Sequence, residues 1–137
     1  MTEVAPVEFV IACARSSDEV VRLIASGVAA GVTHDPGREM APFLRFESEG
    51  IGRDLALRLV PLVVPGVPAR GAHRLLSGSV QPSETGSELR MCLHPAEPMA
   101  LWIPLIGSWL ARTEQRTVEI WARCARSLLE EILVSGG

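Results

Sequence analysis

Three histidines carry most of the chemistry that this sequence could offer, and they lie on three separate segments. His34 is followed by Asp35 in a turn, and an imidazole beside a carboxylate is suited to acid–base work. His34, His73 and His94 could bind zinc together only if the fold assembles them, because no ligand spacing links them along the chain. We therefore predict no metal site and no cofactor.

Cys92 and His94 are two residues apart, so they would share one face of a strand, where an imidazole can activate a thiolate. Their separation along a strand is about 7 Å, which is long for a direct hydrogen bond. Ser77-Gly78-Ser79 lacks the spacing of a nucleophile elbow, and no glycine-rich phosphate loop occurs. We predict no catalytic residue and favour a protein that is not an enzyme.

Candidate anion contacts are three arginines that fall on the polar side of alternating strands, namely Arg45, Arg58 and Arg90. A guanidinium can bind a phosphate or a carboxylate through two parallel hydrogen bonds. Acidic residues occupy the same face, namely Glu47, Asp54 and Glu88. A mixed, solvated surface is therefore the competing interpretation.

The composition is that of one folded domain over residues 1–137, with 47% hydrophobic and 21% charged residues. A net charge of −3 gives no general attraction for nucleic acid, so we expect no nucleic-acid partner. Cys13, Cys92 and Cys124 are an odd set without metal-ligand spacing, and their apolar neighbours indicate buried thiols in a reducing compartment. No secretion signal is visible, so we expect a cytoplasmic protein that survives chelators and reductants.

The chain should open with a strand followed by a helix. Residues 7–14 alternate between apolar and other side chains, which predicts a strand. Ser16 and Glu19 have the spacing of a capping box, in which each side chain binds the backbone N–H of the other residue. A helix should begin there and end near Gly31, ahead of a loop over residues 32–42.

A change to a period of two predicts strands in the middle of the chain. The alternating apolar positions are Leu44 and Phe46, then Leu55, Leu57 and Leu59, then Leu89, Met91 and Leu93. Residues 72–81 alternate poorly, so a strand is least certain there. We count about four strands over residues 43–95. The fold class that follows is α+β, an antiparallel sheet meander with one early helix and a long C-terminal helical region packed on one face.

The C-terminal helical region should be amphipathic from Arg112 onward. Its apolar residues recur at helical spacing, namely Val118, Trp121, Ala125, Leu128 and Ile132. Glu119 and Arg123 are correctly placed for an ion pair on the opposite face.

Residues 98–111 form an uncharged apolar segment that is too short to span a membrane, since a spanning helix needs roughly 20 residues. Trp102 and Trp109 would share a helical face, and Pro104 should either kink the helix or mark its first turn. The segment could cover the sheet, contact a second chain or lie at a membrane surface. The candidate surface consists of Trp102, Leu105, Trp109 and Trp121.

A stretch of this sequence resembles a class of small uncharacterised bacterial proteins, in which a strand, a helix and a meander precede a membrane hairpin. The resemblance spans residues 7–111 and depends on Gly78, the Thr85-Gly86 turn and His94-Pro95. It implies a hydrophobic hairpin. The apolar run here ends earlier, at Arg112, Glu114 and Arg116, and this departure argues against a membrane span.

A second resemblance is to the helix-grip domains of lipid- and polyketide-binding proteins. Residues 7–25 are similar to the opening strand and capped helix of that fold, and residues 116–133 are similar to its closing helix. Helix-grip domains place six strands between the two helices, which is more than the four counted here. This resemblance implies a cavity for a small apolar ligand, in either a carrier or an enzyme.

Two functions therefore remain open from the sequence. The first is a non-catalytic interaction or ligand-binding module that acts through an apolar surface near the C-terminal helices. Its partners would be a second copy, another protein, a small apolar molecule or, peripherally, a membrane. The alternative is a small-molecule enzyme or carrier of helix-grip type.

Overall fold

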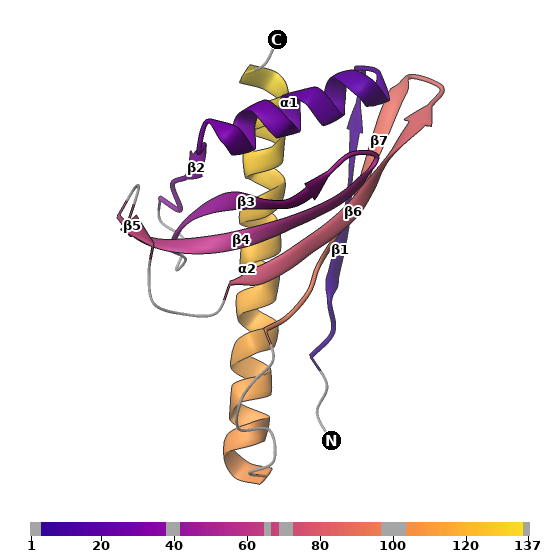
Figure 1. Cartoon of the computed structure of the whole chain (residues 1–137). Helices are drawn as coiled ribbons and strands as arrows, with labels where there is room; N and C mark the ends of the chain where they lie inside the picture. The colour runs from indigo at the N-terminus through magenta and orange to yellow at the C-terminus, as the bar shows by residue number, and fades with distance from the viewer. Residues whose placement is uncertain (1–3, 38–41, 65–66, 69–72, 97–103, 136–137) are drawn as a thin grey trace.

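The computed structural model describes residues 4–37, 42–64, 67–68, 73–96 and 104–135, with the side chains of 63–64, 67–68, 104–108 and 135 left out. In these ranges the chain forms two helices and seven strands (Figure 1). In chain order they are β1 (Val7–Cys13), α1 (Ser17–Ala29), β2 (Thr33–His34), β3 (Phe43–Ile51), β4 (Asp54–Val64), β5 (Val67–Pro68), β6 (Arg74–Ser83), β7 (Gly86–Leu93) and α2 (Pro104–Ser135).

All the strands belong to one antiparallel sheet, in the order β1-β7-β6-β4-β3-β2, with β5 paired to β4. Consecutive strands from β2 to β4 and from β6 to β7 are neighbours, which is the predicted meander. The first strand, β1, returns to pair with the last, so it lies at one edge of the sheet. The α+β class with one early and one C-terminal helix is therefore confirmed.

Six strands lie between the two helices, where the sequence had indicated about four. The two additions, β2 and β5, are only two residues long, which is too short to produce a period in the sequence. Most of the segment in which a strand was least certain belongs to β6, a ten-residue strand over Arg74–Ser83.

The first helix starts as predicted but with only half of the expected capping box. The Ser16 hydroxyl accepts a hydrogen bond from the Glu19 backbone N–H at 3.3 Å. The Glu19 carboxylate instead pairs with the Arg15 guanidinium at 2.6 Å, because this ion pair replaces the weaker bond to the Ser16 N–H. The helix ends before Gly31, whose φ of 71° only glycine adopts at low cost.

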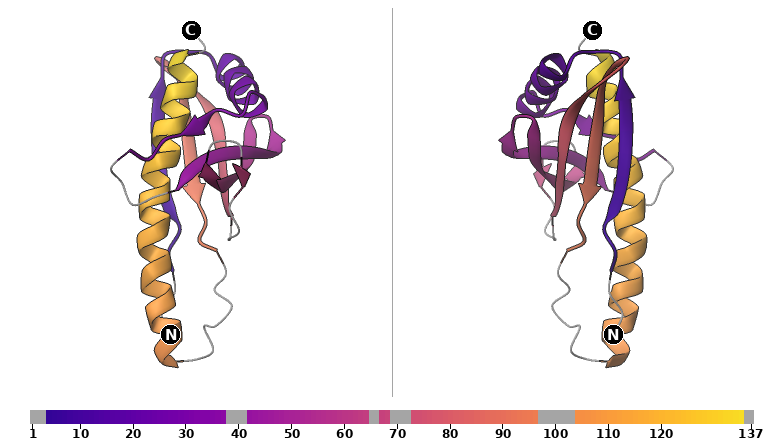
Figure 2. Two further views of the ribbon diagram at one scale, coloured as in Figure 1. Left: turned by 90° about the vertical axis from the view of Figure 1, so that its left-hand side faces the viewer. Right: turned by 90° about the vertical axis from the view of Figure 1, so that its right-hand side faces the viewer.

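The core lies between the curled sheet and the two helices (Figure 2). The predicted inward positions of the strands are buried, including Leu57, Leu76 and Leu93. From α2 the predicted stripe meets them, with Val118 and Leu128 fully buried. The alternation in the strands and the helical period in α2 thus produce a single two-layered core.

Residues 104–111 of the apolar segment and the amphipathic stretch from Arg112 onward are parts of one helix. Helix α2 begins at Pro104 and runs for 32 residues, or about 48 Å. Pro104 therefore marks the first turn and does not kink the helix, because its missing N–H has no partner to lose there. The N-terminal part of α2 extends beyond the end of the sheet (Figures 1 and 2). No helix in the described ranges combines the length and hydropathy needed to cross a membrane.

Candidate functional site

The four residues of the predicted apolar surface do not form one surface in the described part of the chain. Trp109 is 60% exposed, whereas Trp121 is 6% exposed and belongs to the core. Leu105 lies in the first turn of α2, and its side chain is outside the described set. Trp102 also lies outside the described residues. The sequence pattern could not separate these roles, because tryptophan suits both a core and an interface.

The three candidate anion contacts each face a carboxylate on the outer side of the sheet. Arg45 bonds Glu47 at 3.2 Å, and Arg90 bonds Glu88 at 2.8 Å. Arg58 contacts both Glu47 and Glu49. Because the guanidinium groups are already paired, an external anion would have to displace a carboxylate at each position.

The three histidines have different surroundings: His94 is hydrogen-bonded, His34 is partly buried in β2, and His73 is exposed. His94 shares a hydrogen bond of 2.8 Å between its Nε2 atom and the Ser77 hydroxyl. The carboxylate of Asp35, beside His34, accepts a bond from the Gly37 N–H at 2.9 Å. His73 is exposed just ahead of β6. Among the described residues, no group of three His, Cys, Asp or Glu side chains is placed to hold a metal ion.

A serine–histidine pair is also the start of a hydrolytic site, but two parts of such a site are missing from the described residues. No carboxylate is seen to orient the second nitrogen of His94, and no pair of backbone N–H groups faces the Ser77 hydroxyl. Ser77 and His94 by themselves therefore do not indicate a hydrolytic site.

Cys92 lies beside Ser77 on the outer face of the sheet and is not fully buried, unlike Cys124. Burial raises the pKa of the Cys92 thiol above its ordinary value, and the Glu8 carboxylate on the neighbouring strand raises it further. The thiol form therefore dominates near neutral pH, and Cys92 supplies little of the thiolate that a nucleophile requires. Cys13 is also only partly buried, which corrects the expectation that all three cysteines are buried.

A shallow depression of about 460 Å³ lies at the end of the sheet where β6 begins and β7 ends. Its lining is mostly polar and comprises Glu49, Arg58, His73, Arg74, Leu75, His94, Pro95 and Ala96. It holds two of the three histidines and one candidate anion contact. It opens at the rim of the sheet, away from the apolar core between sheet and helices.

Beneath this depression an arginine is buried between sheet and helix. Arg74 donates to the Glu114 carboxylate through both Nε, at 2.6 Å, and a terminal nitrogen. Its guanidinium also lies 4.2 Å from the ring centroid of Trp121. Glu114 accepts a further bond from the Ala96 N–H at 3.0 Å, so the loop after β7 is fixed to α2. This cluster is structural, because each charge is already satisfied.

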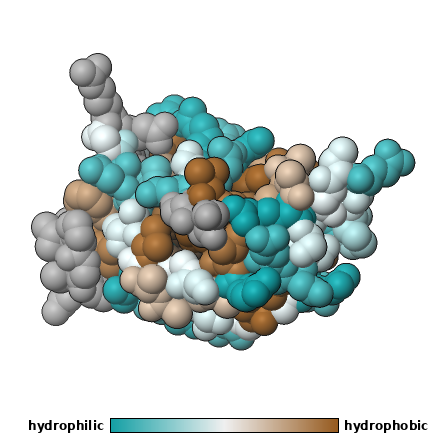
Figure 3. All heavy atoms as spheres, turned by 90° about the horizontal axis from the view of Figure 1, so that it is seen from above, coloured by the Kyte–Doolittle hydropathy of each residue, from teal (hydrophilic) through white to brown (hydrophobic). Residues whose placement is uncertain are grey.

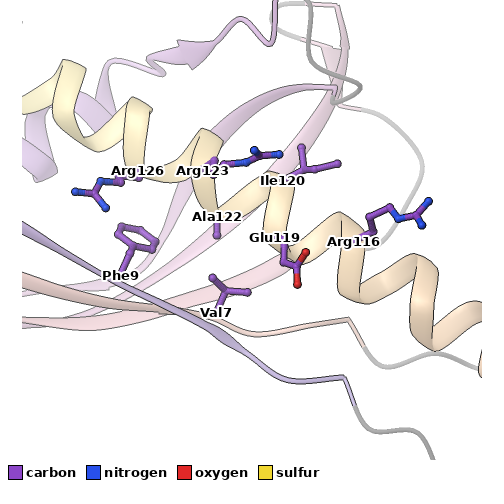
Figure 4. Close-up of a pocket in the computed structure, with 8 residues that line it drawn as sticks. All are labelled: Val7, Phe9, Arg116, Glu119, Ile120, Ala122, Arg123 and Arg126. Atoms are coloured by element: carbon purple, nitrogen blue, oxygen red, sulfur yellow. The ribbon is translucent and has the colours of Figure 1, made fainter.

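A groove runs between the edge strand β1 and helix α2. Figure 4 shows the part of it that lies beside the start of β1. Val7 and Phe9 point from β1 toward the helix, and Arg116 and Arg126 lie at the two ends of the pocket. The volume is about 450 Å³, and its lining is completed by Glu119, Ile120, Ala122 and Arg123. The walls are apolar and the rim is charged.

The groove continues toward the C-terminal end of α2 as a second hollow of about 670 Å³. Ile11 and Cys13 line it from β1, and Arg126, Glu130 and Val134 line it from α2. Seen from this end, apolar atoms gather at the centre of a largely hydrophilic surface (Figure 3). Because Arg126 borders both hollows, the two lie next to each other along β1.

The rim of the groove carries charges that are not all paired within the described ranges. Arg126 and Glu130 bond each other at 2.9 Å. The ion pair predicted between Glu119 and Arg123 does not form among these residues, because the two side chains line the groove and do not reach each other. Arg116 also has no ion-pair partner in the described part of the chain. The rim thus offers two arginines and one glutamate to an occupant.

Sequence reasoning missed this groove, although part of its signal was visible. The alternation of residues 7–14 was visible, and so was the position of Glu119 and Arg123 on the face of the last helix opposite its apolar stripe. The sequence pattern does not reveal that β1 lies at the edge of the sheet beside α2. That neighbourhood follows from the pairing of β1 with β7, which are about eighty residues apart in the chain.

Comparison with known proteins gives a likeness of fold only. No family model matches the chain, and no curated protein matches it. Among solved structures, protein MLL2253 from Mesorhizobium loti is 14% identical, with 87% of this chain and 98% of that chain covered at a TM-score of 0.43. Protein CV1439 from Chromobacterium violaceum is 11% identical, with 82% and 94% covered at a TM-score of 0.37. Both are small bacterial proteins whose names state no activity, and likeness at these scores carries no functional argument.

Proposed function

We propose that this protein is a non-catalytic interaction module that binds an extended polypeptide segment in the groove between β1 and α2. The segment would add to the sheet as a further strand beside β1. Its inward side chains would enter the apolar groove against Phe9 and Ile120. Main-chain hydrogen bonds supply affinity in this mode of recognition, and side-chain pockets supply specificity.

The observation that carries the proposal is the unprotected edge of β1. Within the described residues β1 pairs with β7 alone among the strands, so the N–H and C=O groups on its other side have no strand partner. Just before the strand, the Gln115 side chain of α2 bonds both backbone groups of Ala5. Monomeric proteins usually protect such an edge with a proline, a charged side chain, a bulge, a very short strand or a covering helix. Over its seven residues β1 has no proline and no bulge, its one charged residue is Glu8, and Val10 on its outer face is 44% exposed.

The charges on the rim favour an acidic segment over a basic one. Arg116 and Arg123 are unpaired among the described residues, and they outnumber the single unpaired Glu119. A strand that alternates apolar and acidic residues would place apolar side chains in the groove. Its carboxylates would lie near enough to the rim for the arginines to attract them.

The test uses two fluorescent peptides of equal length, one alternating valine with glutamate and the other alternating valine with lysine. We expect the acidic peptide to bind with an affinity about tenfold higher, as measured by fluorescence anisotropy at nanomolar protein concentration. The double variant Arg116→Glu, Arg123→Glu should remove or reverse this preference, because it inverts the sign of the unpaired rim charge.

The matched control is Arg22→Glu on the exposed face of α1, which changes the net charge of the protein without touching the groove. It should leave the preference for the acidic peptide unchanged. Equal loss of binding in Arg22→Glu and in the groove variant would show a non-specific charge effect. Absence of binding by either peptide would remove the support for strand addition.

A second candidate function is a carrier that takes a small ligand in the histidine-lined depression. Two observations favour it: six strands lie between the helices, as in helix-grip domains, and Arg58, His73 and His94 border one hollow. Titration with short-chain carboxylates, followed by the NMR signals of the two imidazole rings, tests this candidate. We expect signals of both rings to shift together if the depression binds the ligand, and neither to shift if the groove is the only site.

A further inference from the structure

We infer that the N-terminal end of α2 carries a second binding surface, which docks on a membrane that contains anionic phospholipids. Four described residues form this surface, which we call the tip of α2: Trp109, Arg112, Thr113 and Arg116. They line a small hollow of about 240 Å³. The inference goes beyond the proposed function, because it concerns a different surface, and only Arg116 belongs to both.

The tip lies where α2 projects from the rest of the molecule. The N-terminal part of the helix extends beyond the end of the sheet (Figures 1 and 2). Trp109 and Arg116 are separated by two helical turns, so the four residues share one face of α2. Trp109 is 60% exposed, and the other three side chains are exposed as well. A bilayer can therefore reach this face from the end of the molecule.

The chemistry of the tip fits the boundary between lipid tails and headgroups. An indole ring is amphipathic and is enriched at that boundary. Arginine side chains can extend from there to the phosphate groups and bind them through two hydrogen bonds. Residues 104–111 of α2, which precede Arg112, include no charged residue. A helix end with tryptophan, no charge and flanking arginines is typical of a segment that lies at a membrane surface.

Among the residues that the structure describes, the exposed charges at the tip are both positive. Arg112 and Arg116 have no ion-pair partner in this part of the chain. The preceding carboxylate on the helix, that of Glu114, is turned inward and binds Arg74, and Glu119 lines the groove. The net charge of −3 belongs to the whole protein, and charges more than about 8–10 Å away are screened at physiological ionic strength. The tip therefore attracts an anionic surface.

Flotation with two kinds of vesicle tests the inference. One kind contains phosphatidylcholine alone, and the other contains phosphatidylserine and phosphatidylcholine in equal parts. We expect the wild type to partition onto the anionic vesicles at least about tenfold more strongly, because each arginine near an anionic surface contributes a factor of about five. Raising the salt concentration from about 0.05 M to about 0.5 M should remove most of this difference, because salt screens the attraction.

Two variants change the tip without changing a residue that lines the groove, namely Trp109→Ser and Arg112→Glu. Each should lower partition onto the anionic vesicles about tenfold, whereas Arg112→Lys, which keeps the charge, should stay within about threefold of the wild type. The matched control is Arg123→Glu, the same charge reversal about 16 Å further along α2 and beyond the screening length. Its effect should be less than about twofold. All these positions are exposed, and circular dichroism checks that the variants fold.

Three results would overturn the inference: a wild type that floats with neither kind of vesicle, equal binding to both kinds, or equal losses in Arg112→Glu and Arg123→Glu. A wild type that ignores vesicles but binds soluble polyglutamate through Arg112 would also overturn it, and would assign the tip to an acidic protein. The proposed function fails or stands separately. Trp109→Ser and Arg112→Glu should keep the preference for the acidic peptide, because neither residue lines the groove.

Discussion

Replacing Glu114 with alanine is expected to lower the free energy of unfolding by about 3–5 kcal/mol, because it removes the carboxylate that the buried Arg74 guanidinium binds through two hydrogen bonds. Arg74 and Glu114 are only 9% and 11% exposed, so solvent cannot replace the lost carboxylate. The Ala96 N–H loses its acceptor at the same time, which loosens the attachment of the loop after β7. Urea denaturation of the two proteins measures this difference.

The double variant Arg74→Met, Glu114→Leu is the informative companion. It removes both charges and keeps most of the volume, so its stability should recover to within about 1 kcal/mol of the wild type or exceed it. The matched control is Glu130→Ala, which breaks an ion pair on the same helix whose two side chains are about half exposed. Its expected cost is at most about 0.5 kcal/mol. Equal costs for Glu114→Ala and Glu130→Ala would contradict the structural role of the buried pair.

Alanine at Gly78 is the second substitution with a large expected cost, about 1–3 kcal/mol. A Cβ atom there would collide with the carbonyl oxygen of Arg90 and the sulfur of Met91 on the neighbouring strand β7. The carbonyl belongs to the backbone of the paired strand, so it cannot move without disturbing the register of Gly78 with Met91. Thermal or urea unfolding measures the loss.

Gly50→Ala serves as the control for this prediction, because a Cβ atom at Gly50 meets nothing within 4 Å. Its cost should lie within about 0.5 kcal/mol of zero. If Gly78→Ala proved as mild as Gly50→Ala, then β6 and β7 would not approach each other as closely as described.

These two positions also explain why the sequence predicted β6 poorly. The inward face of β6 is formed by Arg74, Leu76, Gly78 and Val80, so two of its four members are not apolar. An arginine is tolerated on the inward face at position 74 because Glu114 binds its guanidinium and the Trp121 ring stacks on it. A glycine is needed at position 78 because β7 leaves no room there for a side chain. Both reasons are tertiary contacts, which a local period cannot reveal. The alternating apolar positions predicted in β3, β4 and β7 are buried, as expected, although β4 is buried on both faces over residues 59–62.

The helices show the same division between local and distant causes. Ser16 and Gly31 bound α1 as predicted, since caps and positive φ angles act within a few residues. For Pro104 the sequence left two alternatives, a kink and the first turn of the helix, because residues 104–111 are apolar on all sides and have no helical stripe. The candidate site was missed for a related reason: it depends on the neighbourhood of β1 and α2, which only the pairing of β1 with β7 establishes.

The central claim is that the free edge of β1 pairs with another strand, and backbone hydrogen exchange tests it most directly. Exchange of the amides of residues 7–13 is followed by mass spectrometry with and without excess acidic peptide. We predict slower exchange in β1 when the peptide occupies the groove, with no change at β2 on the opposite edge. Equally fast exchange of β1 under both conditions would contradict the claim.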